Sequence, residues 1–272
     1  MVRRSGRLLK SLLVPALVVA AWDLLARSGA VSPLVLPSPA QVVRRWAAYA
    51  SPLSPYDPSA ESYLAWLASG ELWLDSAGSL YRVLGGFLLG TALALPLGLL
   101  MGAKGSVNDL LNPVLQVVRP IPPIAFIPLA ILWFGLGNPP AFFLIALGAF
   151  FPVLVNTIAG VRNVDQIYLR AARNLGAGEL TVFRRVMLPG AMPYILAGVR
   201  IGIGIAFIVV IVAEMTAVNR GLGYRILEAR EYFWSDKIIA GMVSIGLIGL
   251  AIDWVMGRVN ARLLRWHRGI EG

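Results

Sequence analysis

Apolar residues in this chain gather in long runs that alternate with short polar segments. Six runs reach the roughly 20 residues that a helix needs to cross a bilayer. They lie at about 8–26, 79–102, 114–134, 139–160, 190–217 and 238–257. Only Gly-Leu-Gly-Asn at 135–138 separates the third run from the fourth, which predicts a tight helical hairpin. The pattern predicts an all-α integral membrane protein with about six transmembrane helices.

The composition agrees with a lipid environment. The 272 residues are 58% hydrophobic and only 14% charged, with a mean hydropathy of +0.74. A soluble domain carries roughly a quarter charged residues. The chain has no Cys and a single His, His267, so it offers neither a disulfide framework nor a thiolate metal site.

The distribution of charge predicts the orientation. With a cytoplasmic N-terminus, the inner segments carry 14 Lys and Arg against 4 acidic residues, whereas the outer segments carry 7 of each. The inner segments are 1–10, 103–110, 161–189 and 258–272, and the outer ones are 27–78 and 218–237. This is the positive-inside pattern, so we expect both termini in the cytoplasm. The basic residues are dispersed between apolar runs, which argues against nucleic-acid binding.

The N-terminal run has two interpretations. Arg3, Arg4 and Arg7 before an apolar stretch also resemble a signal peptide. Asp23 interrupts the run, and the charge distribution fits best if the span is retained.

The outer segment 27–78 should contain a short amphipathic helix. Ser38-Pro39 is typical of a helix start, and Val42, Val43 and Trp46 share one face of the helix that follows. This helix either lies at the membrane surface or packs on other spans. The aromatic residues that could anchor the segment at the interface are Tyr49, Tyr63, Trp66 and Trp73.

The segment 161–189 carries the most specific motif. Three residues separate Ala171-Ala172 from Gly176, nine separate Gly176 from Val186, and Leu188-Pro189 follows. This resembles the cytoplasmic loop signature of ABC importer permeases: Glu-Ala-Ala, three residues, Gly, nine residues, Ile, one residue, Leu-Pro. Arg170 stands where that family usually has Glu, which puts in doubt any role that requires a negative charge there.

The residues of the loop fit a docking helix. Residues 164–175 can form a helix that Gly176 ends, and Ile167, Tyr168, Leu169 and Leu175 give it an apolar stripe that should have a partner. The alternative is an ordinary amphipathic connector. The resemblance implies that residues 164–178 couple the chain to a separate ATPase. The coupling candidates are Ile167, Leu169, Arg170, Ala171, Ala172, Leu175, Gly176, Ala177, Leu188 and Pro189.

Two further stretches extend the resemblance. Residues 119–137 and 198–224 are similar to the third and fifth spans of nitrate, sulfonate, taurine and bicarbonate permeases. The resemblance implies a type I ABC importer in a bacterial cytoplasmic membrane, with two permease copies (a homodimer), two ATPase subunits and a periplasmic or lipid-anchored solute-binding protein. Residues 1–272 then form one permease domain, with its core at about 76–260 and the coupling loop at 161–189.

Polar residues inside the runs are candidates for the translocation path, because charge at membrane depth usually faces protein or water. The candidates are Arg200, Glu214, Arg119 and Asn156. Each has a structural alternative: pairing with another span for Arg200, helix-end packing for Arg119, and interhelical hydrogen bonding for Asn156. Helical rise separates Arg200 and Glu214 by about 21 Å, so they do not pair within one helix.

The fifth run also has a face of small residues, Gly198, Gly202, Gly204 and Ala206. Such a face allows close approach of another backbone. It forms either a seam between two copies or a wall of the path.

The sequence predicts a transporter that is not itself an enzyme. It has no phosphate-binding loop of the Gly-x-x-x-x-Gly-Lys-Ser/Thr type, so ATP should bind the partner subunit, and no cofactor or metal is expected. A secondary transporter without an ATPase is the alternative function, although it would not require the loop motif. The resemblance implies a small anionic or zwitterionic solute, with taurine or another alkanesulfonate first and nitrate or bicarbonate next.

Overall fold

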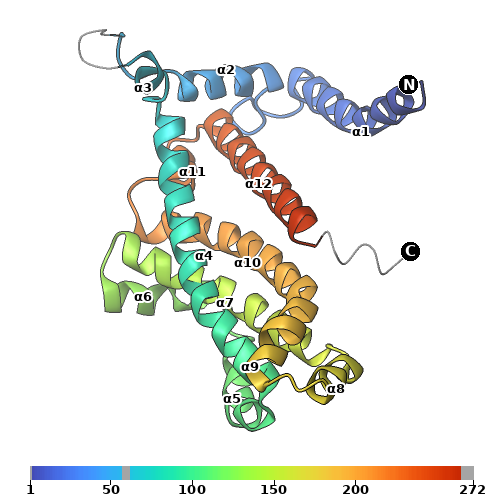
Figure 1. Ribbon diagram of the computed structural model, residues 1–272. Helices are drawn as coiled ribbons and strands as arrows, with labels where there is room; N and C mark the ends of the chain where they lie inside the picture. Colours follow the sequence, from blue (N-terminus) through green and yellow to red (C-terminus); the bar gives the residue numbers. More distant parts are fainter. Residues whose placement is uncertain (1, 57–61, 265–272) are drawn as a thin grey trace. The chain divides into compact units, whose positions relative to one another are not determined.

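The computed structural model describes residues 2–56 and 62–264, with residues 2–12 described only by the course of their helix. His267 lies outside the described residues. All regular structure within the described ranges is helical (Figure 1). The chain divides into two compact units, Met1–Ala77 with Gly221–Gly246, and Gly78–Arg220 with Leu247–Gly272.

The helices follow one another along the chain with short connections. They are α1 (Val2–Arg27), α2 (Pro39–Ala50), α3 (Tyr63–Leu67), α4 (Glu71–Ala103), α5 (Gly105–Val118), α6 (Ile127–Phe134), α7 (Asn138–Arg162), α8 (Gln166–Asn174), α9 (Glu179–Val182), α10 (Leu188–Ala217), α11 (Leu222–Glu231) and α12 (Ser235–Leu263). A 3₁₀-helix, Pro123–Phe126, precedes α6, and a π-helix, Phe183–Met187, joins α9 to α10.

Most of the predicted spans correspond to long apolar helices. Among the described residues, four helices are long and apolar enough to cross a membrane. These are Glu71–Ala103, Asn138–Arg162, Glu179–Ala217 and Ser235–Leu263. They contain the predicted second, fourth, fifth and sixth spans. Helix α1 covers the predicted first span, but it is not among the four.

The predicted third span, 114–134, is broken by a bend and is not one straight helix. It begins earlier, with α5 at Gly105, and the segments Gly105–Val118 and Pro123–Phe134 meet at a bend of 80°. Pro120, Pro122 and Pro123 explain the bend, because proline lacks the backbone N–H that an uninterrupted helix needs. Counted as one broken span, this pair gives a fifth membrane crossing.

In the second unit, glycines bring α4 and α7 into backbone contact. A Cβ added at Gly90 of α4 would lie 2.3 Å from the carbonyl oxygen of Ala146, and one added at Gly102 would lie 2.6 Å from Cβ of Val161. Residue numbers rise together along the contact, so the two helices run parallel. The glycines therefore set the distance between these spans.

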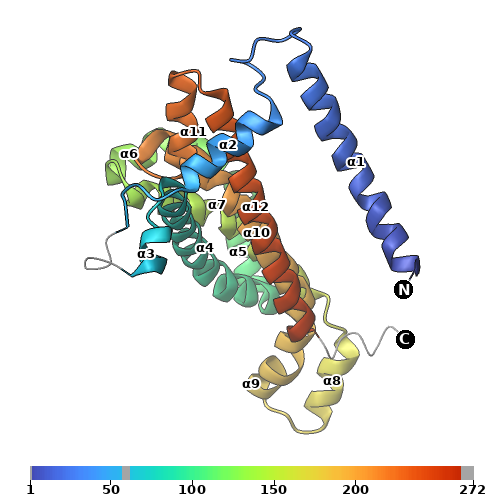
Figure 2. The same ribbon diagram turned by 90° about the horizontal axis from the view of Figure 1, so that it is seen from above.

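Helix α10 packs on α7 in the antiparallel direction, and glycines again set the distance. Figures 1 and 2 both show the two helices side by side. A Cβ at Gly198 would lie 2.6 Å from Cβ of Asn156, and one at Gly202 would lie 3.0 Å from Cγ2 of Val153. Ala206 is completely buried in the adjoining core. The small-residue face is thus mainly a seam within the chain, and only Gly204 faces open space.

In the first unit, α2 packs on its neighbours. Ser38 caps the helix in a reciprocal capping box with Gln41, as the Ser-Pro start predicts. Val42 and Tyr49 are buried, and Trp46 Nε1 donates a hydrogen bond of 2.9 Å to Ser244 Oγ. The packed alternative is therefore correct for this helix.

Tyr49 is part of a polar cluster and is not an interfacial anchor. Its hydroxyl donates to Asp75 Oδ2 at 2.8 Å, and Arg225 Nε donates to the same oxygen at 2.8 Å. The backbone N–H of Gly221 donates to Asp75 Oδ1 at 3.0 Å. Burial and the neighbouring Asp75 carboxylate raise the pKa of Tyr49 well above its usual range, so the phenol stays protonated and keeps donating.

Candidate functional site

Helix α8 lies in the motif-bearing segment between α7 and α10. Asp165 caps its N-terminus by accepting a hydrogen bond of 2.8 Å from the backbone N–H of Ile167. At its C-terminus the backbone N–H of Gly176 donates to Arg173 O at 2.9 Å, and that of Ala177 donates to Ala172 O at 3.1 Å. This pair of bonds is a Schellman motif, and it confirms the predicted helix and its stop.

Gly176 has a positive φ of +81°, and a Cβ added there would meet no atom within 4 Å. The glycine is therefore required by backbone conformation and not by a close contact within the chain. A residue with a side chain rarely adopts this left-handed conformation.

The side chains of α8 divide into two faces. Ile167, Tyr168 and Leu175 are 62%, 63% and 88% exposed, and Arg170 and Ala171 lie on the exposed side as well. The apolar residues among them give this side of the helix an apolar surface, and Arg170 lies on the same side. We call Ile167, Tyr168, Arg170, Ala171 and Leu175 the outer face of α8.

Several predicted coupling residues face the chain's own core. Leu169 is buried, and Ala172, Ala177 and Leu188 pack against the same cluster. That cluster is formed by Val161, Val164, Leu169, Val182, Ala191 and Ile195. The prediction that Leu169 docks into a partner is wrong, because its side chain holds α8 against α7, α9 and α10.

The two arginines of α8 have different partners. Arg173 forms an ion pair of 2.8 Å with Glu179, and this arginine lowers the pKa of the Glu179 carboxyl below its usual range. Arg170 makes only a long hydrogen bond of 3.4 Å from Nε to the carbonyl oxygen of Gln166. Among the described residues, Arg170 has no carboxylate partner, so its charge is available to a docking surface.

The second half of the motif is helical. Glu179–Ala217 forms one helical run of 39 residues, in which Val186 belongs to the π-helix and Leu188-Pro189 begins α10. The segment expected as a loop to residue 189 therefore joins a span directly. Glycine at 176 and proline at 189 mark the two ends of this connection.

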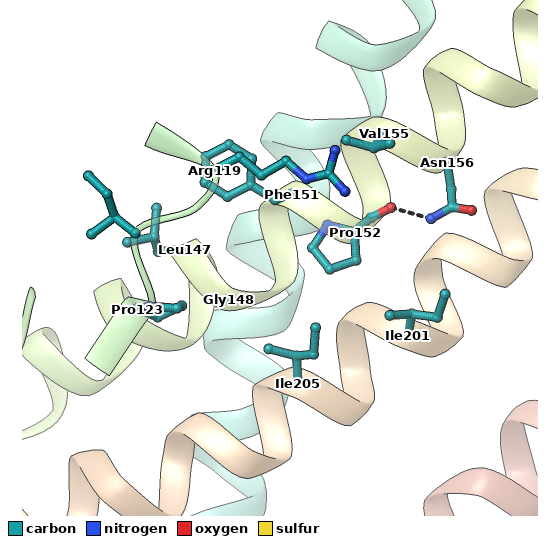
Figure 3. Close-up of a pocket in the computed structure, with 11 residues that line it drawn as sticks. Arg119, Pro123, Leu147, Gly148, Phe151, Pro152, Val155, Asn156, Ile201 and Ile205 are labelled. Carbon is teal, nitrogen blue, oxygen red and sulfur yellow. Dashed lines mark hydrogen bonds between the residues drawn. The ribbon is translucent and has the colours of Figure 1, made fainter. Parts of the chain in front are cut away.

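A cavity of about 390 Å³ lies beside the bend between α5 and α6 (Figure 3). It is lined by Arg119, Ile121, Pro123, Leu147, Gly148, Phe151, Pro152, Val155, Asn156, Ile201 and Ile205. The walls come from the bend, from α7 and from α10, and they are mostly apolar. Arg119 and Asn156, two of the predicted path residues, are thus brought together.

The polar groups of this cavity are few. Asn156 Nδ2 donates a hydrogen bond of 2.8 Å to the carbonyl oxygen of Pro152. Figure 3 shows the guanidinium of Arg119 extending from the bend toward Val155. Within the described part of the chain, this guanidinium has neither an ion pair nor a hydrogen bond.

Arg200 lies on α10 but pairs with a carboxylate on another span. Its Nε and Nη2 atoms donate to the two oxygens of Asp253 on α12, each at 2.9 Å. The two side chains are 50% and 54% exposed. Arg200 is therefore paired with another span, which was the alternative to a position in the translocation path.

Glu214 is completely buried in an ion pair that the sequence did not predict. Arg82 Nη1 lies 2.6 Å from Glu214 Oε1, and the two side chains are 7% and 0% exposed. Ser79 Oγ also donates to Glu214 at 2.9 Å. Glu214 therefore joins α10 to α4.

The same arginine connects the start of α7 to the segment that follows α10. Arg82 Nε donates to Asn138 Oδ1 at 2.7 Å, and its Nη1 donates to the carbonyl oxygen of Arg220 at 3.0 Å. The backbone N–H of Gly137 donates to Ala217 O at 2.7 Å. The α6–α7 hairpin, the end of α10 and α4 are thus held together at the end of the unit opposite α8.

No group of three or more His, Cys, Asp or Glu side chains that could hold a metal ion occurs in the described residues.

Comparison with known proteins gives consistent matches. A family described as "binding-protein-dependent transport system inner membrane component" matches residues 94–265. Over 256 residues the chain is 34% identical to the taurine transport system permease protein TauC of Escherichia coli (strain K12), which covers 94% of this chain and 89% of TauC. Over 264 residues it is 36% identical to the putative aliphatic sulfonates transport permease protein SsuC of Bacillus subtilis (strain 168), which covers 97% and 90% of the two chains.

Among solved structures, the chain resembles the MetNI methionine ABC transporter in an inward-facing conformation. The TM-score is 0.61 at 17% sequence identity, over 75% of this chain and 99% of the other. At this level of identity the likeness concerns the fold alone.

Proposed function

Because this chain belongs to the family of binding-protein-dependent transport system inner membrane components, we propose that it forms the solute path of an ATP-driven importer and couples to its ATPase through α8. The chain is an ABC importer permease subunit, and its relatives are transport permeases and not enzymes. The expected all-α membrane fold of type I importers is confirmed. The family match spans both compact units, which supports one permease domain over residues 1–272.

The observation that carries the coupling assignment is the outer face of α8. Three large apolar side chains stay mostly exposed on a short helix whose other face is fixed to the core. An apolar surface of this kind on a loop outside the spans is typical of a protein contact. The helix fits a groove of an ATPase subunit, with Arg170 at the rim.

The proposed solute is a small anion or zwitterion, with taurine or another alkanesulfonate first and nitrate or bicarbonate next. Two relatives with these substrates in their names support the first choice. The proposed assembly contains two copies of this chain, two ATPase subunits that bind ATP, and a solute-binding protein on the outer side. The excess of basic residues in segments 1–10, 103–110, 161–189 and 258–272 supports cytoplasmic termini in a bacterial inner membrane.

The test is reconstitution of the chain with candidate ATPase and solute-binding proteins from the same organism. We expect the ATPase to co-purify with this chain, and ATP hydrolysis to rise when loaded binding protein is added. Labelled taurine should enter proteoliposomes only with ATP. Uptake by this chain without any ATPase, driven by an ion gradient, would establish the alternative of a secondary transporter.

A further inference from the structure

Arg119 differs from the other arginines of the predicted spans in its surroundings. Arg82 is buried against Glu214, and Arg200 is paired with Asp253. Arg119 has no carboxylate partner among the described residues, although it lies where an apolar span breaks. An unpaired cation in such a segment is costly unless it meets water or a counter-ion, so its position requires an explanation.

The cavity beside Arg119 supplies a place for such a counter-ion. Its volume of about 390 Å³ lies within the range of small-molecule sites, which are mostly apolar with a few placed polar groups. The apolar walls from α7 and α10 lower the local dielectric constant and so strengthen attraction between a guanidinium and an anion. Guanidinium presents paired N–H groups that match the oxygens of a planar or tetrahedral oxyanion.

Asn156 adds a hydrogen-bond acceptor to the cavity, whereas Arg119 offers only donors. Its amide nitrogen is directed to the Pro152 carbonyl, while its carbonyl oxygen Oδ1 accepts no hydrogen bond from any described residue. A free acceptor on the α7 wall of the cavity that Arg119 also lines complements an N–H or ammonium donor. The pair therefore suits a zwitterion that carries an oxyanion at one end and an amine at the other.

We propose that this cavity is an anion-binding site in which Arg119 binds the oxygens of a sulfonate, nitrate, carboxylate or phosphate group. The anion belongs either to the transported solute or to a lipid headgroup. In the first case the proposal rests on the proposed function and says where in the chain that solute binds. Arg200 is not the corresponding site, because Asp253 already neutralises it. Asn156 favours an aminoalkanesulfonate over a simple alkanesulfonate.

The experiment uses the complete complex with ATPase and binding protein in proteoliposomes, and compares Arg119→Gln and Arg119→Lys with wild type. Arg44→Gln, which removes an exposed arginine far along the chain, is the matched control. With Arg119→Gln, taurine uptake should fall about tenfold or more, the factor that corresponds to loss of a charge-assisted hydrogen bond. Stimulated ATP hydrolysis should persist, Arg119→Lys should retain part of the uptake, and Arg44→Gln should match wild type.

The source of the anion is decided on the same samples by mass spectrometry of bound lipid. Reduced uptake with unchanged lipid content identifies the solute, whereas loss of bound anionic lipid with wild-type uptake identifies a headgroup. Unchanged uptake and unchanged lipid in Arg119→Gln would overturn the proposal. A wild-type complex that does not transport, or does not retain its ATPase, would instead refute the proposed function.

A second variant keeps the test decisive if Arg119→Gln does not assemble. Ile201→Trp fills the cavity from α10 and leaves the charge of Arg119 in place. It should lower uptake severalfold while the complex still assembles. Wild-type uptake with the tryptophan in the cavity would also overturn the proposal.

Discussion

Replacement of Gly176 by Val should uncouple transport from ATP hydrolysis. Gly176 ends α8 at φ +81°, and no atom lies within 4 Å of the position that a Cβ would occupy. The cost of a side chain is therefore purely conformational. For an L-residue the left-handed conformation costs roughly 1–2 kcal/mol, and a β-branched residue such as Val lies at the upper end of that range.

This cost is large enough to measure. About 1–2 kcal/mol changes the ratio of two local conformations by a factor of roughly 5–30. The helix stop would give way first, because the hydrogen bonds from Gly176 and Ala177 depend on the left-handed turn. The outer face of α8 would then no longer be held in the orientation that docks.

The neighbouring Gly178 provides a matched control. It also has no atom within 4 Å of a built Cβ, but its φ and ψ are −68° and 159°, an extended conformation that suits Val. The substitution Gly178→Val adds the same atoms to the same loop without the strain. Gly176→Asn adds a graded case, because Asn adopts the left-handed conformation more readily than other residues do.

The assay measures ATPase retention, hydrolysis stimulated by loaded binding protein, and uptake, all in one preparation. We expect Gly176→Val to insert normally and to lose stimulation and uptake. Gly178→Val should behave as wild type, and Gly176→Asn should lie between them. Equal behaviour of the two valine variants would show that the left-handed stop of α8 is not needed for coupling.

Three further predictions test other parts of the molecule. A single Cys in place of Ser54 should be labelled from outside the cell only, and labelling from the cytoplasm would contradict the proposed topology. Arg82→Met should lower the free energy of unfolding by about 3–5 kcal/mol, because it leaves Glu214 buried without its partner cation; thermal unfolding in detergent measures this, and a wild-type midpoint would refute the role of the pair. The single variants Arg200→Asp and Asp253→Arg should each impair assembly and uptake, whereas the double variant that exchanges the two residues should preserve both. Loss of uptake in the double variant would argue that Arg200 itself contacts the solute.

The sequence predicted the long elements and the motif helix well because their signals are local. Runs of apolar residues identified four of the long spans, and the Ser38 cap and the Gly176 stop follow from the conformational preferences of single residues. Hydropathy averages over a window, so it located the third span but did not give the size of the bend at the three prolines, 120, 122 and 123.

The contacts between distant residues were the part that the sequence did not specify. Arg82 Nη1 and Glu214 Oε1 are 2.6 Å apart, but the two residues belong to separate spans. Nothing in the local sequence of either residue identifies the other as its partner. The same holds for Arg200 and Asp253. Leu169 was assigned to the wrong face of α8, because a helix with apolar residues on several sides does not reveal which side meets the core.

The glycine seam between α7 and α10 has a consequence for how proteins of this kind can diverge. Any side chain at Gly198 would collide with Cβ of Asn156 at 2.6 Å, so this line of α10 cannot vary without a shift of the neighbouring α7. Ile201 and Ile205 lie on the same helix but line the cavity, where a change of size alters the volume of the cavity. One helix therefore combines a line that tolerates almost no substitution with a line that tolerates many, and selectivity can drift while the arrangement of the spans is preserved.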